Sequence, residues 1–245
     1  MYNIKIDPIT YTLLDIDAYS TILENIREAE IKALSSVGIA VHDESYLRGN
    51  ANMGGLSRFN GLLSLNNKIE NIKFYKVLSA TIKGINRMDI DVSVDLINSS
   101  DYSLISYNKK SMLGISPTLE GLTNTFLLII NNSNILAIDS LYEKDVEVDL
   151  EKVVAAAKLK NKAIVFLNRT LDLSDSTIYK KAYRLAELCK KYNCPIMVAS
   201  GAKFSTEVGI FDNIYSIFND VNIPENLIVN KNESTFNEYL SNFKK

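Results

Sequence analysis

The chain has 245 residues, of which 47% are hydrophobic and 23% are charged. Both fractions are typical of a folded globular protein and exclude a disordered or fibrous chain. The 27 basic residues nearly balance the 29 acidic ones, and a formal net charge of −2 gives no global electrostatic attraction to nucleic acid or anionic lipid. We therefore expect neither nucleic acid nor a membrane among the partners of this protein.

The amino terminus and the two cysteines indicate where the protein works. The opening MYNIKIDPIT lacks the basic region and apolar run of a secretory signal, and no apolar segment is long enough to span a bilayer. Cys189 and Cys194 are five positions apart, which fits neither a redox pair nor a zinc site. We expect a cytoplasmic protein with two reduced thiols in or near its core.

Short apolar runs rich in β-branched residues recur along the chain. They are too short for helices and predict strands. In chain order they lie at 3–6, 37–41, 75–82, 103–107, 134–138, 163–167, 195–199 and 226–230.

Helical patterns lie between these strands, most clearly at 20–35, 149–160 and 174–192. Ser20 and Asp149 are suitable N-cap residues for the first two. Because helix-length segments separate most strands, we expect a mainly parallel α/β sheet, either closed into a barrel or open and doubly wound. We expect one domain, residues 1–245, since α/β barrels often reach this length.

Two segments fit this pattern less well. Residues 46–57 form a Gly/Asn-rich loop that is long for a connector, and the sequence leaves open whether this loop closes over a site. Residues 83–95 alternate apolar and acidic residues, which suggests a small antiparallel hairpin with the preceding strand.

The common nucleotide and hydrolase motifs are absent from the sequence. It contains no dinucleotide fingerprint, no phosphate-binding loop and no Gly-x-Ser-x-Gly elbow. Its single histidine, His42, excludes any mechanism that needs two. The chemistry must therefore come from other polar side chains.

Polar residues follow most of the predicted strands. In a barrel the carboxyl ends of parallel strands meet at one face, where catalytic residues usually stand. The same residue types also serve as ordinary turn and cap residues, and that interpretation stays open for each. The residues concerned are Asp7, His42, Asp43, Glu44, Asn108, Asp139, Asn168, Arg169, Ser200 and Lys203.

The order of the elements and two long strings resemble the PHP (polymerase and histidinol phosphatase) superfamily, in particular its small bacterial phosphatase branch. Residues 17–43 are similar to the family's His-Ala-Tyr-Ser-Thr helix and the following Thr-Asp-His strand end. Residues 187–230 are similar to its last barrel strand, the Ser-Asp-x-His loop and the closing strand. The resemblance covers nearly the whole chain and implies a distorted seven-stranded (β/α)7 TIM-like barrel. For most members it also implies a three-metal centre that hydrolyses phosphoesters.

At the positions that match the family's metal ligands, the chain carries other residues. They are Asp7 in the His-x-His motif, Asp17 before Ala-Tyr-Ser-Thr, His42-Asp43 for Asp-His, Asn108 for a histidine, Asp139 for the histidine of His-Pro, and Gly201-Ala202-Lys203 for Asp-x-His.

A multinuclear centre needs several hard or imidazole ligands to hold its ions close together, and a lysine brings positive charge to the place of a cation. We therefore expect no cofactor, or at most one divalent ion (zinc, manganese or magnesium). Its candidate ligands are Asp7, Asp17, His42, Asp43 and Asp139. Lys203 and Arg169, with Asn108 and Ser200, are instead candidates for binding an anion directly.

Three functions remain open at this point. The first is a PHP-like protein without catalysis, a pseudo-phosphatase that binds a small phosphorylated or anionic ligand or a protein partner. The second is a phosphoric ester hydrolase with a remodelled site that uses one metal or none, with His42 or Asp43 as acid or base. The third is an unrelated function on the same barrel, because a fold does not determine a function.

Overall fold

The computed structural model describes residues 2–11, 20–42, 68–69, 71–82, 100–107, 118–131 and 135–243, without the side chains of residues 41–42, 68–69 and 80–82. Asp17, Asp43, Glu44 and Asn108 lie outside the described residues. The same holds for the 46–57 loop and the 83–95 segment.

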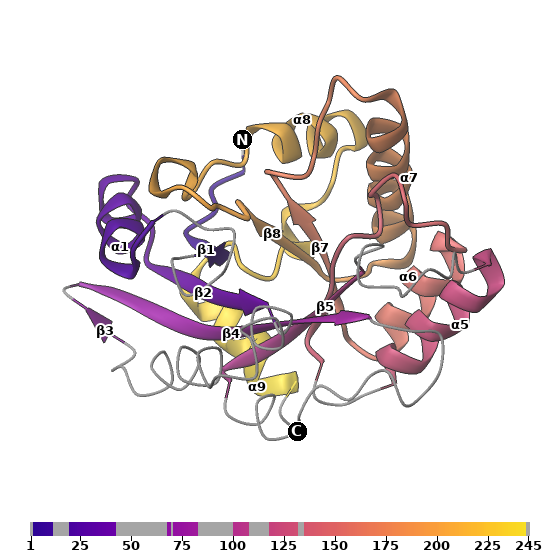
Figure 1. The fold of residues 1–245 in the computed structure, drawn as a ribbon, viewed down its shortest axis with the longest axis horizontal. Helices are drawn as coiled ribbons and strands as arrows, with labels where there is room; N and C mark the ends of the chain where they lie inside the picture. The colour runs from indigo at the N-terminus through magenta and orange to yellow at the C-terminus, as the bar shows by residue number, and fades with distance from the viewer. Residues whose placement is uncertain are drawn as a thin grey trace, which may run out of the picture.

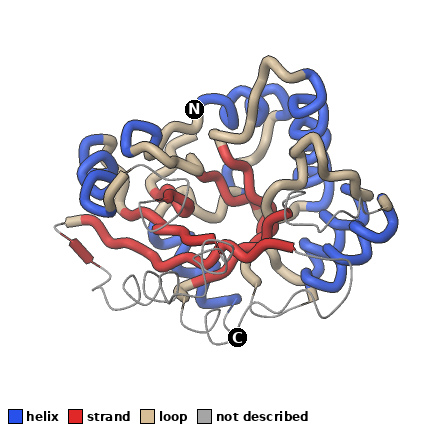
Figure 2. The backbone as a smooth tube through the Cα atoms, viewed as in Figure 1, coloured by secondary structure: helices blue, strands red, loops and turns tan. Residues whose placement is uncertain are grey.

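Seven parallel strands form a nearly closed barrel, in the order β1-β2-β4-β5-β6-β7-β8 (Figures 1 and 2). The barrel agrees with the fold class expected from the resemblance and excludes the open doubly wound sheet. A short strand, β3 (Lys68–Ile69), pairs antiparallel with the start of β4. The seven barrel strands are β1 (Ile6–Tyr11), β2 (Ser36–His42), β4 (Ile72–Ile82), β5 (Tyr102–Tyr107), β6 (Ala137–Ile138), β7 (Ala163–Leu167) and β8 (Ile196–Ala199).

Most of the helices cover the outside of the barrel, as Figure 2 shows. Asp149 caps α6 by accepting a hydrogen bond from the N–H of Lys152, as expected, whereas Thr21 and not Ser20 caps α1. No described helix is both long and apolar enough to cross a membrane. The helices are α1 (Ile22–Ile31), α5 (Leu119–Ile130), α6 (Leu150–Leu159), α7 (Ser176–Tyr192), α8 (Asp212–Val221) and α9 (Glu233–Phe243), with the 3₁₀ turns η3 (Ser205–Glu207) and η4 (Glu225–Leu227).

The end of α7 explains the spacing of the two cysteines. Asn193 takes the left-handed conformation with φ 51°, and the N–H of Cys194 donates to the carbonyl of Cys189 at 2.9 Å. This is the Schellman arrangement, in which the two residues that bracket the helix end pack together. Both thiols are free and buried, so the pair serves as apolar packing at the helix end.

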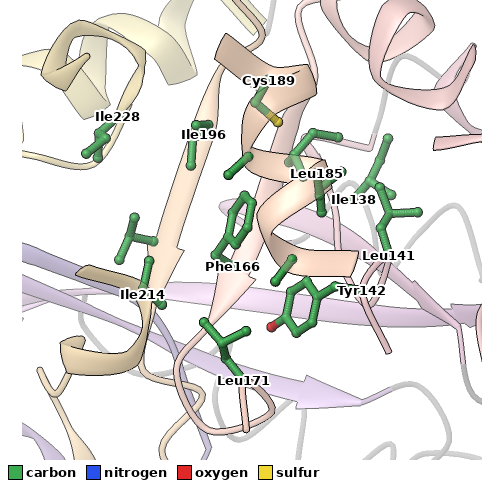
Figure 3. Close-up of a cluster of buried hydrophobic side chains, with 14 of the residues drawn as sticks. Ile138, Leu141, Tyr142, Phe166, Leu171, Leu185, Cys189, Ile196, Ile214 and Ile228 are labelled. Carbon is green, nitrogen blue, oxygen red and sulfur yellow. The ribbon is translucent and has the colours of Figure 1, made fainter. Parts of the chain in front are cut away.

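Two apolar clusters fill the molecule. The inner cluster lies within the barrel and includes Phe236 of α9, whose ring packs against the rings of Tyr75 in β4 and Tyr102 in β5. The outer cluster lies between the strands and the helices, where the rings of Tyr142 and Phe166 stack at 5.8 Å (Figure 3). α9 therefore contributes to the core of the barrel, in contrast to α7, which packs against its outer surface.

The contact between β1 and β8, which we call the seam, is closed by a segment that does not form the expected strand. Residues 226–230, expected as a strand, contain η4 and a single bridge from Ile228 to Ile196. The buried amide of Asn230 takes the place of strand pairing, since it donates to the carbonyls of Ile6 at 2.9 Å and Val198 at 2.7 Å and accepts from the N–H of Val198. β1 likewise begins at Ile6 and not at residue 3.

Candidate functional site

The carboxyl ends of the strands meet at one end of the barrel, which we call the barrel mouth. Asp139 follows β6, Arg169 follows β7, and Ser200 and Lys203 follow β8. The structure therefore brings these four predicted residues to one end of the molecule. His42 ends β2, where its backbone pairs with Ser79, and its side chain lies outside the description.

Asp7 is buried at the seam and contacts the loop that follows β8. One carboxylate oxygen accepts the N–H of Ser200 at 2.9 Å, and the other accepts the N–H of Gly209 at 2.8 Å. The two carboxylate oxygens thus each accept a hydrogen bond from one end of the loop at residues 200–209. This geometry favours a structural role for Asp7 over metal ligation.

Burial also changes the titration of Asp7. Loss of hydration raises the pKa of this carboxyl to about 6, although hydrogen bonds from Ser200 and Gly209 favour the ionised form and oppose the rise. The carboxyl therefore titrates in a mildly acidic range.

Ser200 and Gly201 shape the first turn after β8. The hydroxyl of Ser200 accepts the N–H of Ala202 at 3.1 Å. Gly201 has φ 65°, in the left-handed region, and its N–H donates to the carbonyl of Ile9 at 3.1 Å. Ser200 therefore already takes part in local hydrogen bonds that set the direction of the loop toward Lys203.

Three donors converge on the carboxylate of Glu207. The guanidinium of Arg169 lies 3.0 Å from Oε2, and the N–H groups of Lys203 and Phe204 donate to the same oxygen at 2.9 and 3.3 Å. Two consecutive backbone N–H groups with a guanidinium form a typical binding arrangement for an oxyanion. The predicted anion-binding residues Arg169 and Lys203 thus share one internal anion, which the sequence analysis did not identify.

The loop after β6 carries a second polar cluster. Oδ1 of Asp139 accepts the N–H of Ser140 at 2.5 Å, and Ser140 has φ 68°, which is uncommon and strained for a residue other than glycine. Burial raises the pKa of Glu143 to about 7, and a hydrogen bond from the side chain of Ser140 opposes this rise. Asp139 and Glu143 therefore lie on the same loop, which follows β6.

Two long side chains fix that loop. The hydroxyl of Tyr142 donates to the carbonyl of Leu167 or the hydroxyl of Thr170 and accepts the N–H of Leu167 at 2.9 Å. The ammonium of Lys181 donates to the carbonyls of Glu143, Lys144 and Val146 at 3.0–3.1 Å. The loops that carry Asp139 and Arg169 are thereby joined through Tyr142.

The metal ligands expected from the sequence lie only partly within the described mouth. Among the residues that the structure describes, no three His, Cys, Asp or Glu side chains gather where they could hold a metal ion. Both oxygens of Asp7 accept backbone N–H groups, and a lysine stands at the third position of Gly201-Ala202-Lys203. Of the predicted metal ligands, Asp17 and Asp43 fall outside the described chain.

Comparison with curated proteins finds relatives of similar length. A probable phosphatase from Clostridium acetobutylicum is 28% identical over 239 residues, which cover 96% of this chain and 93% of the relative. One from Caldicellulosiruptor saccharolyticus is 29% identical over 244 residues, which cover 97% and 96%. No family model matches the sequence.

Solved structures share the fold. Histidinol phosphate phosphatase from Lactococcus lactis, in complex with zinc, L-histidinol and phosphate, has a TM-score of 0.58 at 12% identity, covering 90% of this chain and 94% of that one. The putative histidinol phosphatase from Listeria monocytogenes has a TM-score of 0.60 at 12% identity, covering 86% of this chain and 100% of that one. A chain of archaeal ribonuclease P with mature tRNA has a TM-score of 0.62 at 12% identity, covering 98% of this chain and 91% of that one.

Proposed function

We propose that the chain is a PHP-like protein that binds a small phosphorylated or other anionic ligand at the barrel mouth, without a multinuclear metal centre. The observation that supports this most is the convergence of Arg169 and the N–H groups of Lys203 and Phe204 on one carboxylate oxygen. These donors bind an oxyanion by charge and direction, which requires no metal. The ligand's oxyanion would replace the Glu207 carboxylate.

A phosphate group is a suitable ligand for this donor set. Arg169 and Glu207 are each about one third exposed, at 34% and 36%, so an exchange between Glu207 and a ligand does not require the core to open. Lys203, on the loop after β8 that also carries Glu207, adds a second positive charge. The phosphate bound to the Lactococcus lactis neighbour and the probable phosphatases among the relatives are consistent with a phosphorylated ligand.

Binding without catalysis is the reading that the residues favour. Under the resemblance to PHP proteins, the positions of the family's metal ligands carry other residues in this chain. Both carboxylate oxygens of Asp7 accept backbone N–H groups, and Gly201 has no side chain. We expect this single-domain protein to work in the cytoplasm. The barrel mouth would alternatively bind a protein partner. A chain of similar fold occurs in archaeal ribonuclease P with mature tRNA.

An active phosphoric ester hydrolase is the alternative function. Full-length relatives named probable phosphatases favour it. Asp139 and Glu143, on the loop after β6 that contains the strained Ser140, are the candidates for acid or base work together with His42 or Asp43. At most one divalent ion would take part.

Arg169→Gln is expected to weaken the binding of inorganic phosphate by roughly 10- to 100-fold. The reason is the loss of a charge-assisted hydrogen bond of about 1.5–3 kcal/mol. Glu207→Gln should strengthen binding, because the internal anion that competes for Arg169 is neutralised. Isothermal titration calorimetry measures both, and p-nitrophenyl phosphate with added manganese, zinc or magnesium tests for hydrolysis.

Arg184→Gln is the matched control for the arginine variant. Arg184 lies on α7, is about half exposed at 53%, and pairs with Glu151 and Glu187 on the outside of the barrel. It should leave phosphate binding unchanged. Equal phosphate affinity in wild type and Arg169→Gln would contradict the anion site, and metal-stimulated hydrolysis of p-nitrophenyl phosphate would favour the hydrolase.

A further inference from the structure

A buried lysine lines a cavity at the end of the barrel opposite the mouth. Lys162 immediately precedes β7 and is only 3% exposed. The cavity has a volume of about 250 Å³ and is lined by Lys162, Lys160, Asn131, Asn161, Asn242 and Phe243, together with Ile130. It lies where α5, α6 and α9 end, and none of its residues belongs to the site at the mouth (Figure 1).

The amine of Lys162 is held at a defined place in this cavity. Nζ donates a hydrogen bond to the carbonyl of Ile135 and lies 4.3 Å from the ring centroid of Phe243. Lys160, a second cation, lines the same cavity. Burial lowers the pKa of the Lys162 ammonium to about 8, and repulsion from Lys160 contributes to the change.

An amine in such surroundings has the properties of a nucleophile. A lysine that is removed from water and placed beside another cation loses its proton more easily than an exposed one. About a tenth of the Lys162 side chains would carry a neutral amine near pH 7, compared with well under a thousandth for an ordinary exposed lysine. Because Lys162 lines the cavity, a small reagent bound there lies next to its side chain.

We propose that Lys162 reacts reversibly, as a Schiff base, with a small aldehyde or α-keto acid bound in this cavity. The nitrogen attacks the carbonyl carbon and forms a C–N bond. After proton transfers the carbonyl oxygen leaves as water, and the imine remains. The step needs no oxidant or reductant, and hydrolysis reverses it.

The other lining residues indicate a carbonyl compound that also carries an acid group. The ammonium of Lys160 and the amides of Asn131, Asn161 and Asn242 are suitable partners for a carboxylate. The ring of Phe243 offers an apolar wall. A volume of about 250 Å³ suits a compound of a few carbon atoms and excludes a nucleotide.

The test uses the full chain, glyoxylate as the probe and sodium cyanoborohydride to fix any imine as a carboxymethyl group. Peptide mass spectrometry then gives the labelling rate of each lysine between about pH 6 and pH 9. We expect Lys162 to be labelled at least roughly tenfold faster near pH 7 than the exposed Lys158 of α6, with a plateau above the pKa of about 8.

Two variants sharpen the result. Lys160→Gln removes the neighbouring cation, so the pH profile of Lys162 labelling should move to higher pH. The labelling profile of Lys158 should not change. Lys162→Met should remove the fast-labelled site. If that variant does not fold, the pH profile of Lys162 labelling in the wild-type chain is sufficient for the test. The proposal is overturned if Lys162 is labelled no faster than Lys158, or if its rate rises in parallel with that of Lys158 through pH 9. None of these readouts depends on phosphate binding at the mouth.

Discussion

Asp7→Ala is expected to lower the free energy of unfolding by about 2–4 kcal/mol. The substitution leaves the N–H groups of Ser200 and Gly209 without an acceptor at the buried seam between β1 and β8. Each unsatisfied buried donor costs about 1–3 kcal/mol, and partial access of water at Gly209 reduces the sum. The loop at 200–209 should loosen with the seam, so phosphate binding through Arg169 should also weaken.

Urea unfolding followed by circular dichroism measures this loss. Asp220→Asn is the matched control, since Asp220 is exposed at the end of α8 and accepts one hydrogen bond from Tyr179. It should change the unfolding free energy by less than about 0.5 kcal/mol. A loss in Asp7→Ala no larger than in Asp220→Asn would show that the carboxylate does not hold the seam.

The pH dependence of stability gives a second readout at Asp7. The folded pKa of about 6 lies above the ordinary aspartate pKa of 3.8, so between these two values the folded state keeps a proton that the unfolded state has lost. The stabilisation from Asp7 is complete below the unfolded pKa and is lost as pH rises through the folded pKa, by about 3 kcal/mol in all. Asp7→Asn should remove this decline from unfolding curves measured between about pH 4 and pH 7.

Tyr142→Phe is expected to cost about 1–3 kcal/mol of stability and to weaken phosphate binding. The ring and its stacking on Phe166 remain, while the N–H of Leu167 loses its acceptor and Thr170 loses a partner. Leu167 and Thr170 flank Arg169, so the change acts on the position of the guanidinium. Thermal unfolding and phosphate titration measure the two effects.

Tyr183→Phe serves as the control for the hydroxyl of Tyr142. Its ring lies 6.2 Å from that of Tyr179, and within the described part of the chain its hydroxyl has no hydrogen-bond partner. The control should change neither stability nor binding. If Tyr142→Phe is equally neutral, the loops after β6 and β7 are held by other contacts.

Most of the barrel could be predicted from local patterns. The apolar runs at 163–167 and 195–199 became β7 and β8, and the amphipathic stretch at 174–192 became α7, because burial of one face determines both kinds of element. The run at 226–230 has the same composition as a strand. It forms only one bridge because the side chain of Asn230 makes the hydrogen bonds that a strand would make.

The site was less predictable, because its decisive contacts join residues far apart in the sequence. Barrel topology alone predicts that Asp139, Arg169 and Lys203 lie at the carboxyl ends of strands. Two other contacts depend on how the seam and the loops pack. Asp7 accepts N–H groups about 200 positions away, and Arg169 pairs with Glu207. The carboxylate of Glu207 accepts the N–H of Phe204 before η3, and nothing in the sequence indicates that Glu207 also pairs with Arg169.

The metal content of the purified chain tests the central claim most directly. Inductively coupled plasma mass spectrometry on protein prepared without chelators should find no more than one zinc, manganese or magnesium ion per chain. Phosphate binding should persist after dialysis against a chelator, because Arg169 and the N–H groups of Lys203 and Phe204 bind the anion. Two or three tightly held ions per chain, with phosphate binding lost on chelation, would contradict the account.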